Sequence, residues 1–392
     1  PVYIGYDKTV ESRSYLKELR GRSKKSESWR QLIKARRIFR SRFGCAYISF
    51  GKAIPLDDFS ERSNQEVMKG HTYCPEKNGD IGYIIMSSIN NNMVVSPTGL
   101  VSLIMFSTTN YALAEADLVR MISILFDLQR ESSGNSQIQT LSKDPDKIIG
   151  ICQSLGILQE FTHQFGSVYF IDSKDMHIAS YSRNNILPCF AIVSVIAALL
   201  YHHDSTKFDD LCSRATDIIE FIREDLFLLD IDSREKIVDL VAANVAALTA
   251  LGLLERDSGT GIVRRPDMLK PEFSYLRMVG NFVRPRLEFY SVLLTLIQSH
   301  ARDNVVKESS VEQEYKKNLE RIRLLHGFDI SESLQDINCK KIWNLLKVKG
   351  CLDRKESDHF LLSDGFSRTK NAFDLFLHRD LSESLNRASR EA

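Results

Sequence analysis

The chain has 392 residues and a formal net charge of +1, and 43% of its residues are hydrophobic and 26% charged. With only 9 prolines, this composition excludes a disordered, collagen-like or low-complexity protein. The seven cysteines form no C-x-x-C pair, which favours a reducing compartment over a disulfide framework or a zinc site. At about 150 residues per domain, the length predicts roughly two or three domains.

The first residues predict a strand, a helix and a second strand. Residues 1–6 have the composition of a buried strand end, residues 28–42 have helical spacing, and residues 45–50 alternate as a strand. Because the chain begins at Pro1, without Met and directly in a strand, we expect it to be part of a longer protein. Residues 1–58 are therefore interpreted as the last α/β unit of a larger sheet.

Basic residues are concentrated in this unit. Between Lys8 and Arg42 there are thirteen basic and three acidic residues, so this segment carries +10 and the remainder of the chain −9. Such a concentration indicates a polyanionic partner, namely lipid headgroups, a phosphorylated small molecule, coenzyme A or nucleic acid, with a solvated helix face as the alternative. Apolar residues at near-helical spacing make Trp29–Arg42 an amphipathic helix suited to an anionic membrane surface, although a helix docked within the chain has the same pattern.

After a polar stretch at 59–81, the pattern becomes mainly helical. Helices are predicted near residues 82–94, 97–106, 113–130, 145–155, 185–201, 209–226, 233–250, 271–300, 311–326 and 369–386. The apolar run Ile186–Tyr201 is shorter than the roughly 20 residues that span a bilayer. We therefore expect it to be a buried core helix, and no segment to be long enough to span a membrane.

Three glycines recur at similar spacing. Gly156, Gly252 and Gly350 each follow a predicted helix and precede two apolar residues, a turn and a second strand, and they stand 96 and 98 residues apart. A helix that ends at Gly and leads into a short hairpin is the closing part of a winged-helix unit. Such units can bind DNA, but the only basic pair at the end of a hairpin is Arg264–Arg265. Hairpins that pack helices within a structural domain are the favoured interpretation.

The sequence lacks the common catalytic motifs, because it contains no Walker A loop, G-x-G-x-x-G, G-x-S-x-G or H-E-x-x-H. The run His202-His203-Asp204 closes an apolar helix, where His favours the helix dipole, so metal binding is not the preferred interpretation. His359 and Asp364 have His-x4-Asp spacing but lie in the third predicted hairpin, beside no phosphate-binding sequence. We reject them as a catalytic pair and expect no cofactor or metal.

Several segments resemble the glycerol-3-phosphate acyltransferases, in particular the bacterial membrane-bound enzyme. Residues 1–7, Pro-Val-Tyr-Ile-Gly-Tyr-Asp, resemble the fourth and last acyltransferase block. The resemblance covers nearly the whole chain and continues through residues 15–21 (Tyr-Leu-Lys-Glu-Leu-Arg-Gly), 24–28, 50–56, 181–185 (Tyr-Ser-Arg-Asn-Asn) and 324–327 (Leu-Leu-His-Gly). One departure is that the family tends to carry arginines after the helix ending at Phe106. This chain has Ser-Thr-Thr-Asn-Tyr at 107–111, so the sequence does not support a basic role there.

The resemblance implies an enzyme that moves a fatty acyl group from acyl-CoA or acyl-carrier protein to the 1-hydroxyl of glycerol 3-phosphate, the first step of phospholipid synthesis. In the family a His-x4-Asp pair supplies the general base and an arginine-containing block binds phosphate, and both precede the fourth block. Neither is expected in this chain, which alone is expected to be inactive. The expected substrate-binding residues are those of the block and of the basic segment after it, namely Tyr3, Gly5, Tyr6, Lys17, Arg20 and Lys24.

These features predict a mainly α chain with minor β. Residues 1–58 are expected to be the C-terminal strand–helix–strand remnant of an α/β acyltransferase domain, 59–81 a linker, and 82–392 a helical C-terminal domain with three winged-helix-like hairpins. The expected partners are acyl-CoA or acyl-carrier protein, glycerol 3-phosphate and an anionic phospholipid membrane surface, with peripheral attachment to the cytoplasmic side of the inner membrane and no nucleic acid. The alternative is a helical, winged-helix-like interaction protein that binds nucleic acid or a protein partner.

Overall fold

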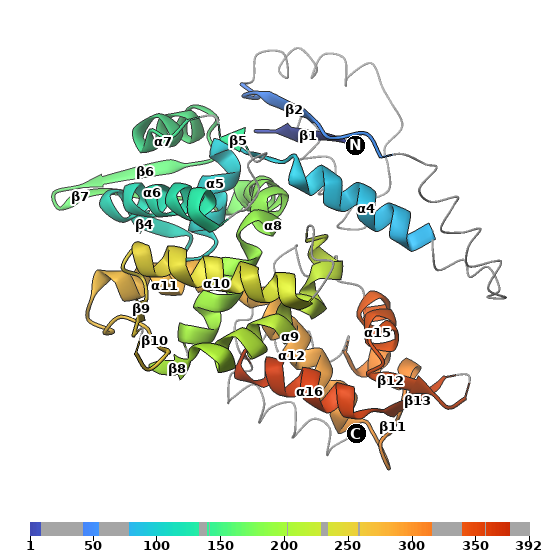
Figure 1. The fold of residues 1–392 in the computed structure, drawn as a ribbon. Coiled ribbons are helices and arrows are strands. Elements are labelled where there is room, and N and C mark those ends of the chain that lie inside the picture. Colours follow the sequence, from blue (N-terminus) through green and yellow to red (C-terminus); the bar gives the residue numbers. More distant parts are fainter. Residues whose placement is uncertain are drawn as a thin grey trace, which may run out of the picture.

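The computed structural model describes residues 1–8, 42–54, 78–132, 139–140, 142–201, 203–228, 234–257, 259–315, 339–356 and 358–376. Over these residues the protein is mainly helical, and its strands form small sheets of two or three strands (Figure 1). The expected mainly α class with minor β is therefore confirmed. The basic helix expected at Trp29–Arg42 lies outside the described residues, apart from Arg42.

The N-terminal strands form a separate two-stranded sheet. Strand β1 (Val2–Tyr6) pairs antiparallel with β2 (Ala46–Phe50). Helix α4 (Asn78–Asn91) contacts β1 and begins earlier than the predicted residue 82. The following strand β3 (Val94–Val95) pairs parallel with β5 (Gln139–Thr140).

The rest of the chain repeats one order of elements three times: helix, strand, helices, and a hairpin whose second strand lies in the middle of the sheet. The first unit comprises α5 (Pro97–Met105), β4 (Ala112–Ala114), α6 (Glu115–Ser132), α7 (Pro145–Ser154), β6 (Gln159–His163) and β7 (Gly166–Phe170). The second comprises α8 (Met176–Tyr201), β8 (Ser205–Lys207), α9 (Phe208–Leu226), α10 (Arg234–Ala250), β9 (Glu255–Arg256) and β10 (Ile262–Arg264). The third comprises α12 (Arg284–Ser299), β11 (Val305–Lys307), a helical stretch at 308–315, α15 (Cys339–Val348), β12 (Leu352–Arg354) and β13 (His359–Leu362).

Four short or connecting helical elements complete the described fold. The turn η2 (Ser173–Asp175) precedes α8, α11 (Pro271–Gly280) connects the second and third units, and α16 (Asp364–Phe373) continues into η3 (Asp374–Phe376). Helix α16 begins earlier than the predicted residue 369 and packs on α9 and α12. Figure 1 shows the third unit at the opposite end of the molecule from β1 and β2.

The three predicted glycine caps are confirmed. Gly156, Gly252 and Gly350 have φ values of +70°, +71° and +65°, the left-handed conformation that glycine adopts without steric cost. In each unit the next residue returns its backbone N–H to a carbonyl of the last helical turn, as Ile157 does to Cys152 at 3.1 Å. This bond directs the chain out of the helix and into the hairpin, so the repeated glycine fixes where each hairpin starts.

Helix α8 runs through the centre of the fold and is longer than predicted. It begins at Met176 rather than near residue 185, and it contacts α5, α9, α10 and α11. Within the described residues, Ser173–Tyr201 is one helical stretch that is long and apolar enough to cross a membrane by length and composition, which corrects the expectation that no segment is. Of its apolar 18-residue window, 67% is buried inside the protein, in agreement with the predicted core helix. The start of α8 is obscured in the sequence because Ser182 and Arg183 are polar residues that are nevertheless buried.

The single helix predicted at 271–300 is broken between α11 and α12. Pro285 in the first turn of α12 has no N–H to donate, so a continuous helix through it would lose the backbone hydrogen bond to residue 281. The buried hydroxyl of Ser194 on α8 donates to the carbonyl of Val279 at 2.7 Å and accepts from the N–H of Val283 at 3.1 Å. Both ends of the break are thus stabilised by α8.

The hydrophobic core of the three units is continuous, whereas the N-terminal sheet has a small cluster of its own. That cluster consists of Tyr3, Tyr47, Met93 and Val94. The N-terminal sheet is therefore attached to the helical body through one face and a few contacts.

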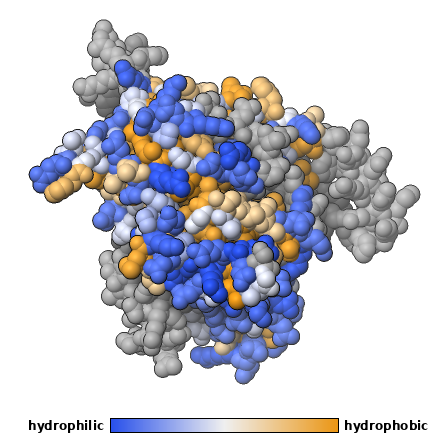
Figure 2. Space-filling view, turned by 60° about the vertical axis from the view of Figure 1, so that its left-hand side comes forward, coloured by the Kyte–Doolittle hydropathy of each residue, from blue (hydrophilic) through white to orange (hydrophobic). Residues whose placement is uncertain are grey.

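On the face seen in Figure 2, hydrophilic residues dominate and apolar residues are exposed in several separate patches.

Candidate functional site

Strand β1 presents alternate residues to opposite sides. Tyr3, Gly5 and Asp7 face the helical body and are buried, while Val2, Ile4 and Tyr6 are exposed on the other face. The Tyr3 ring lies across Gly5, because a Cβ at Gly5 would meet the Tyr3 hydroxyl oxygen at 2.7 Å. Burial raises the pKa of Tyr3 to about 12, so this phenol stays protonated at neutral pH. The expected site residues Tyr3 and Gly5 thus share one face, and Tyr6 lies on the other.

Asp7 joins the N-terminal sheet to the helical body. Its carboxylate accepts hydrogen bonds from the Tyr47 hydroxyl at 2.7 Å, the Cys45 N–H at 2.9 Å and the Thr98 hydroxyl at 3.2 Å. Thr98 belongs to the first turn of α5, so this fully buried carboxylate connects both strands to the first helical unit. The neighbouring Lys8 ammonium donates to the carbonyl of Leu155 at 3.0 Å and strengthens the same junction.

A groove with a cavity of about 450 Å³ lies between β1 and the helices. Its walls come from β1, α4, the first half of α8, the end of α9 and the start of α12. Met86, Asp225 and Phe227 also line a second cavity of about 440 Å³, which runs on between α4, the end of α9 and α15 and is mainly apolar. The two cavities form one groove that is polar beside β1 and apolar farther along.

The polar end of the groove combines amide and guanidinium groups. Asn184 and Asn185 line it from α8, and the side-chain amide of Asn185 has no hydrogen-bond partner among the described residues. Arg286 lines it from α12 and forms an ion pair with Asp225, whose carboxylate also accepts from the Tyr290 hydroxyl at 2.7 Å. Because Asp225 neutralises Arg286, this end offers hydrogen-bond donors without a strong net charge.

Arg183, next to Asn184, is a buried guanidinium without a carboxylate partner among the described residues. It donates to the side-chain oxygen of Asn184 at 2.9 Å, and its Cζ lies 4.6 Å from the centre of the Phe106 ring. Burial, together with the charge of the nearby Arg286, lowers the pKa of Arg183 to about 10. A buried charge balanced only by an amide and an aromatic face is costly, which marks the 181–185 segment as more than core packing.

The remaining expected site residues are placed only in part. Lys17, Arg20 and Lys24 lie outside the described residues. His359 lies on β13, 4.0 Å from the carboxylate of Glu356, and Asp364 begins α16. Among the described residues, His359 and Asp364 make no hydrogen bond or ion pair with each other.

The structure adds groove residues that sequence reasoning did not single out. Asn184 and Asn185 fall within the 181–185 segment, which carries the resemblance but whose role no local pattern indicates. Arg286 and Asp225 have no signal in the sequence, since they meet only through the packing of α12 on the end of α9. The described part of the groove can bind and orient an amphiphilic ligand, and it contains no paired base for proton transfer.

Known proteins match this chain over most of its length. The family described as the glycerol-3-phosphate acyltransferase C-terminal region matches residues 15–355. The glycerol-3-phosphate acyltransferase of Pseudomonas paraeruginosa (strain DSM 24068 / PA7) is 28% identical over 341 residues, and that of Pseudomonas putida (strain W619) is 26% identical over 339 residues. Each alignment covers 85% of this chain but 40% of the relative, so the chain spans less than half the length of these relatives. With the match extending from residue 15 to residue 355, the chain belongs to the glycerol-3-phosphate acyltransferase C-terminal region family.

Proposed function

We propose that the protein to which this chain belongs transfers a fatty acyl group from acyl-CoA or acyl-carrier protein to the 1-hydroxyl of glycerol 3-phosphate, the first step of phospholipid synthesis. The observation that carries the proposal is the family match over residues 15–355, supported by relatives named glycerol-3-phosphate acyltransferase. The chain spans 40% of those relatives, and its described residues hold no paired general base. We therefore assign the proton-transfer chemistry to the part of the parent enzyme that this chain does not include.

Within that enzyme, the groove beside β1 has a substrate-side role. Its polar end offers the guanidinium of Arg286 and the side-chain amide of Asn185, which has no partner among the residues that the structure describes, and its farther part is apolar. An acyl thioester has the same two parts, a polar carrier and an apolar chain, which favours this groove as a contact for the acyl donor. Val2, Tyr3 and Ile4 line the groove from β1, whereas Gly5 and Tyr6 do not line it. Lys17, Arg20 and Lys24 remain proposed contacts for phosphate groups.

Residues 1–58 are proposed to be the end of the acyltransferase domain, 59–81 a linker and 82–392 the helical domain. The small separate cluster around Tyr3 and Tyr47 supports this division. The outer face of the β1–β2 sheet is apolar and exposed, with Ile48 at 59% and Phe50 at 78%. Monomeric proteins rarely expose such a face. We therefore assign this face, which includes Tyr6, to a contact with the remainder of the acyltransferase domain.

The three repeated units are proposed to be winged-helix-like modules that serve for packing. The order of elements and the central third strand of each sheet support the comparison. Two of the three hairpin arginines of the second unit are engaged within the protein, because Arg265 pairs with Asp204 and Arg256 stacks on Phe208 at 3.9 Å, whereas Arg264 is exposed. Arginines held in this way are not free to neutralise phosphates, which favours the acyltransferase role over nucleic-acid binding.

Attachment to the membrane is proposed to be peripheral, on the cytoplasmic side of the inner membrane. The burial of α8 supports a core helix rather than a transmembrane one. The basic segment 29–42 carries the charges that an anionic phospholipid surface attracts, each worth about 1 kcal/mol near the surface. Co-sedimentation with anionic vesicles should weaken in high salt and when Arg36, Arg37 and Arg40 are changed to Glu. Binding that ignores both changes would contradict an electrostatic attachment.

The activity is tested by acyl transfer to radiolabelled glycerol 3-phosphate. We expect the parent enzyme to acylate glycerol 3-phosphate from acyl-CoA or acyl-carrier protein, and this chain alone to give no product. Measurable turnover by this chain that is abolished by His359→Ala would overturn the assignment of the base. A parent enzyme that is folded and inactive with both donors would overturn the proposed function.

A further inference from the structure

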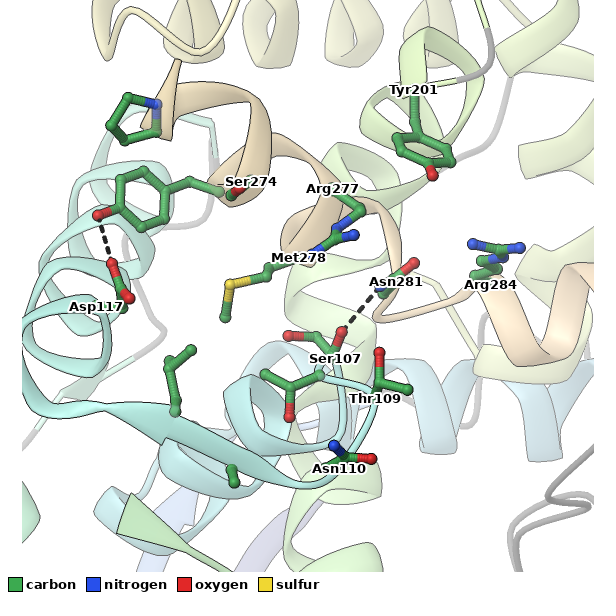
Figure 3. A pocket seen from close by; sticks show the side chains of 15 residues that line it. Ser107, Thr109, Asn110, Asp117, Tyr201, Ser274, Arg277, Met278, Asn281 and Arg284 are labelled. Carbon is green, nitrogen blue, oxygen red and sulfur yellow. Dashed lines mark hydrogen bonds between the residues drawn. The ribbon is translucent and has the colours of Figure 1, made fainter. Parts of the chain in front are cut away.

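A polar cavity of about 560 Å³ opens between the first unit and helices α11 and α12 (Figure 3). One wall is the turn after α5, residues 107–110, and the opposite wall carries Arg277, Asn281 and Arg284. Tyr201, at the end of α8, closes one side. No residue lines both this cavity and the groove beside β1, so the two are distinct sites.

Two guanidinium groups face this cavity from different helices. Arg277, in the last turn of α11, is exposed and forms no ion pair with any residue that the structure describes. Arg284, the first residue of α12, donates through Nε to Glu288 at 2.7 Å, and its Cζ lies 6.0 Å from the centre of the Tyr201 ring. These contacts hold the Arg284 guanidinium in place and leave its two terminal nitrogens for other acceptors.

The facing turn supplies neutral donors. Thr109 and Asn110 are exposed, and neither their side chains nor their backbone N–H groups have a hydrogen-bond partner among the described residues. The turn is fixed in place, because the side-chain amide of Asn281 donates to the carbonyl of Ser107 at 2.8 Å. The donors of the turn are therefore held at the cavity before any ligand arrives.

Acceptors are scarce by comparison. Asp117 is the only carboxylate in the described lining, and it accepts from the Tyr275 hydroxyl at 2.9 Å at the end of the cavity away from Arg284 (Figure 3). An excess of donors, two of them guanidinium groups from the consecutive helices α11 and α12, matches the several oxygens of a phosphate group better than a single carboxylate. A neutral or cationic ligand would leave these donors without acceptors.

From this geometry we propose that the cavity between the 107–110 turn and Arg277 and Arg284 binds the phosphate group of a phosphate monoester. The sequence does not support a basic role for residues 107–111, and the basic groups come instead from α11 and α12. The site lies outside the groove beside β1, the proposed contact for the acyl donor, so it adds a second phosphate-recognising site to the protein. The same chemistry is offered by a soluble phosphate ester and by a monoester lipid headgroup, which the test separates.

The test measures binding to this chain by calorimetry, without any turnover. Inorganic phosphate and glycerol 3-phosphate should each bind with saturation at one site, and Arg277→Gln and Arg284→Gln should each weaken binding by about tenfold, or ~1.4 kcal/mol. Thr109→Val, an exposed change in the turn, should weaken it severalfold. Arg214→Gln is the matched control, because Arg214 is an exposed helical arginine that does not line the cavity. Circular dichroism confirms that each variant is folded.

A second arm identifies the source of the phosphate. Co-sedimentation compares vesicles of phosphatidylcholine with vesicles that also contain phosphatidic acid. If inorganic phosphate and glycerol 3-phosphate bind, and Arg277→Gln and Arg284→Gln both weaken this binding, the result supports a soluble ligand. If only vesicles with phosphatidic acid bind, and the same two variants weaken that binding, the result supports a lipid headgroup. Absence of saturable binding in both arms, or binding that the two arginine variants leave unchanged, overturns the proposal. Because neither arm uses acyl transfer, this outcome is independent of the proposed activity.

Discussion

The junction at Asp7 allows a sharp prediction, since one carboxylate connects both N-terminal strands to α5. In Asp7→Ala the Tyr47 hydroxyl loses its acceptor while its side chain stays buried. The Thr98 hydroxyl keeps Ser96 as a partner at 3.2 Å, and the N–H of the exposed Cys45 can bond to water. The loss is therefore dominated by the Tyr47 bond.

The expected magnitude follows from that single bond. Leaving a buried hydroxyl without a partner costs roughly 1–3 kcal/mol, and the lost charge-assisted bond adds to this, so Asp7→Ala should destabilise the sheet by about 3 kcal/mol. Asp7→Asn should cost only about 1 kcal/mol, because its amide oxygen can accept from Tyr47 and Cys45 while its NH2 group donates to Thr98. In the double variant Asp7→Ala/Tyr47→Phe no hydroxyl is orphaned, so the cost should be less than the sum by about 1–2 kcal/mol.

The assay is native-state hydrogen exchange of the backbone amides of β1, which reports opening of this sheet separately from global unfolding. Urea denaturation of the same variants gives the global free energy of unfolding. The reasoning is refuted if Asp7→Asn and Asp7→Ala accelerate exchange equally, or if the two changes in the double variant are additive.

Three further changes test the packing and the charges. Gly280→Val should lower the free energy of unfolding in urea by about 1–3 kcal/mol, because a Cβ there would lie 2.9 Å from a backbone nitrogen of α8. Gly150→Ala lies in open space on α7 and should raise the free energy of unfolding by up to about 1 kcal/mol. Equal effects of the two variants would contradict this account. The folded-state pKa of Tyr3 is raised from 10 to about 12, so its contribution to stability is complete below pH 10 and is lost as the pH rises from 10 to 12. In Tyr3→Phe, the fall of the free energy of unfolding over this range should be smaller by up to about 1.4 kcal/mol per pH unit. A pH profile of stability that Tyr3→Phe leaves unchanged would be inconsistent with this assignment. Asp225→Ala leaves Arg286 and the Tyr290 hydroxyl without their carboxylate and should lower the free energy of unfolding in urea by about 3 kcal/mol. Asp225→Leu combined with Arg286→Met and Tyr290→Phe leaves neither group without a partner and should recover most of that loss; no recovery would argue against these lost polar contacts as the cause.

Features set by neighbouring residues were predictable from the sequence. The glycine caps at Gly156, Gly252 and Gly350 depend on a few residues around each helix end, and all three hairpins were predicted from them. Both strands of the N-terminal sheet and the alternation of β2 were predicted for the same reason, but β1 was expected to be a buried strand end and instead alternates between exposed and buried residues. The break at 281–283 was missed, because it depends on a hydroxyl of α8 as well as on Pro285.

Features set by distant residues were not predictable. The contact between Asp7 and Thr98 joins residues 91 positions apart, and no local pattern indicates it. The start of α8 was misplaced because the burial of Arg183 is a result of tertiary packing under Phe106. The candidate site was found only in part, since Tyr3 was named from the recognised block and lines the groove, whereas Gly5 and Tyr6 were named from it and do not line the groove. The place of Asn185 in the groove follows from packing.

The most direct test of the central claim is the steady-state kinetics of the parent enzyme carrying Asn185→Ala. The side-chain amide of Asn185 lines the polar end of the groove beside β1 and has no partner within the described part of the chain, so its loss removes a proposed substrate contact without orphaning a described protein group. We expect the apparent Michaelis constant for the acyl donor to rise by about tenfold, with a smaller effect on glycerol 3-phosphate, and the exposed control Gln298→Ala to behave as the unchanged enzyme. Unchanged constants for both substrates in a folded Asn185→Ala enzyme would contradict a substrate-side role for this groove.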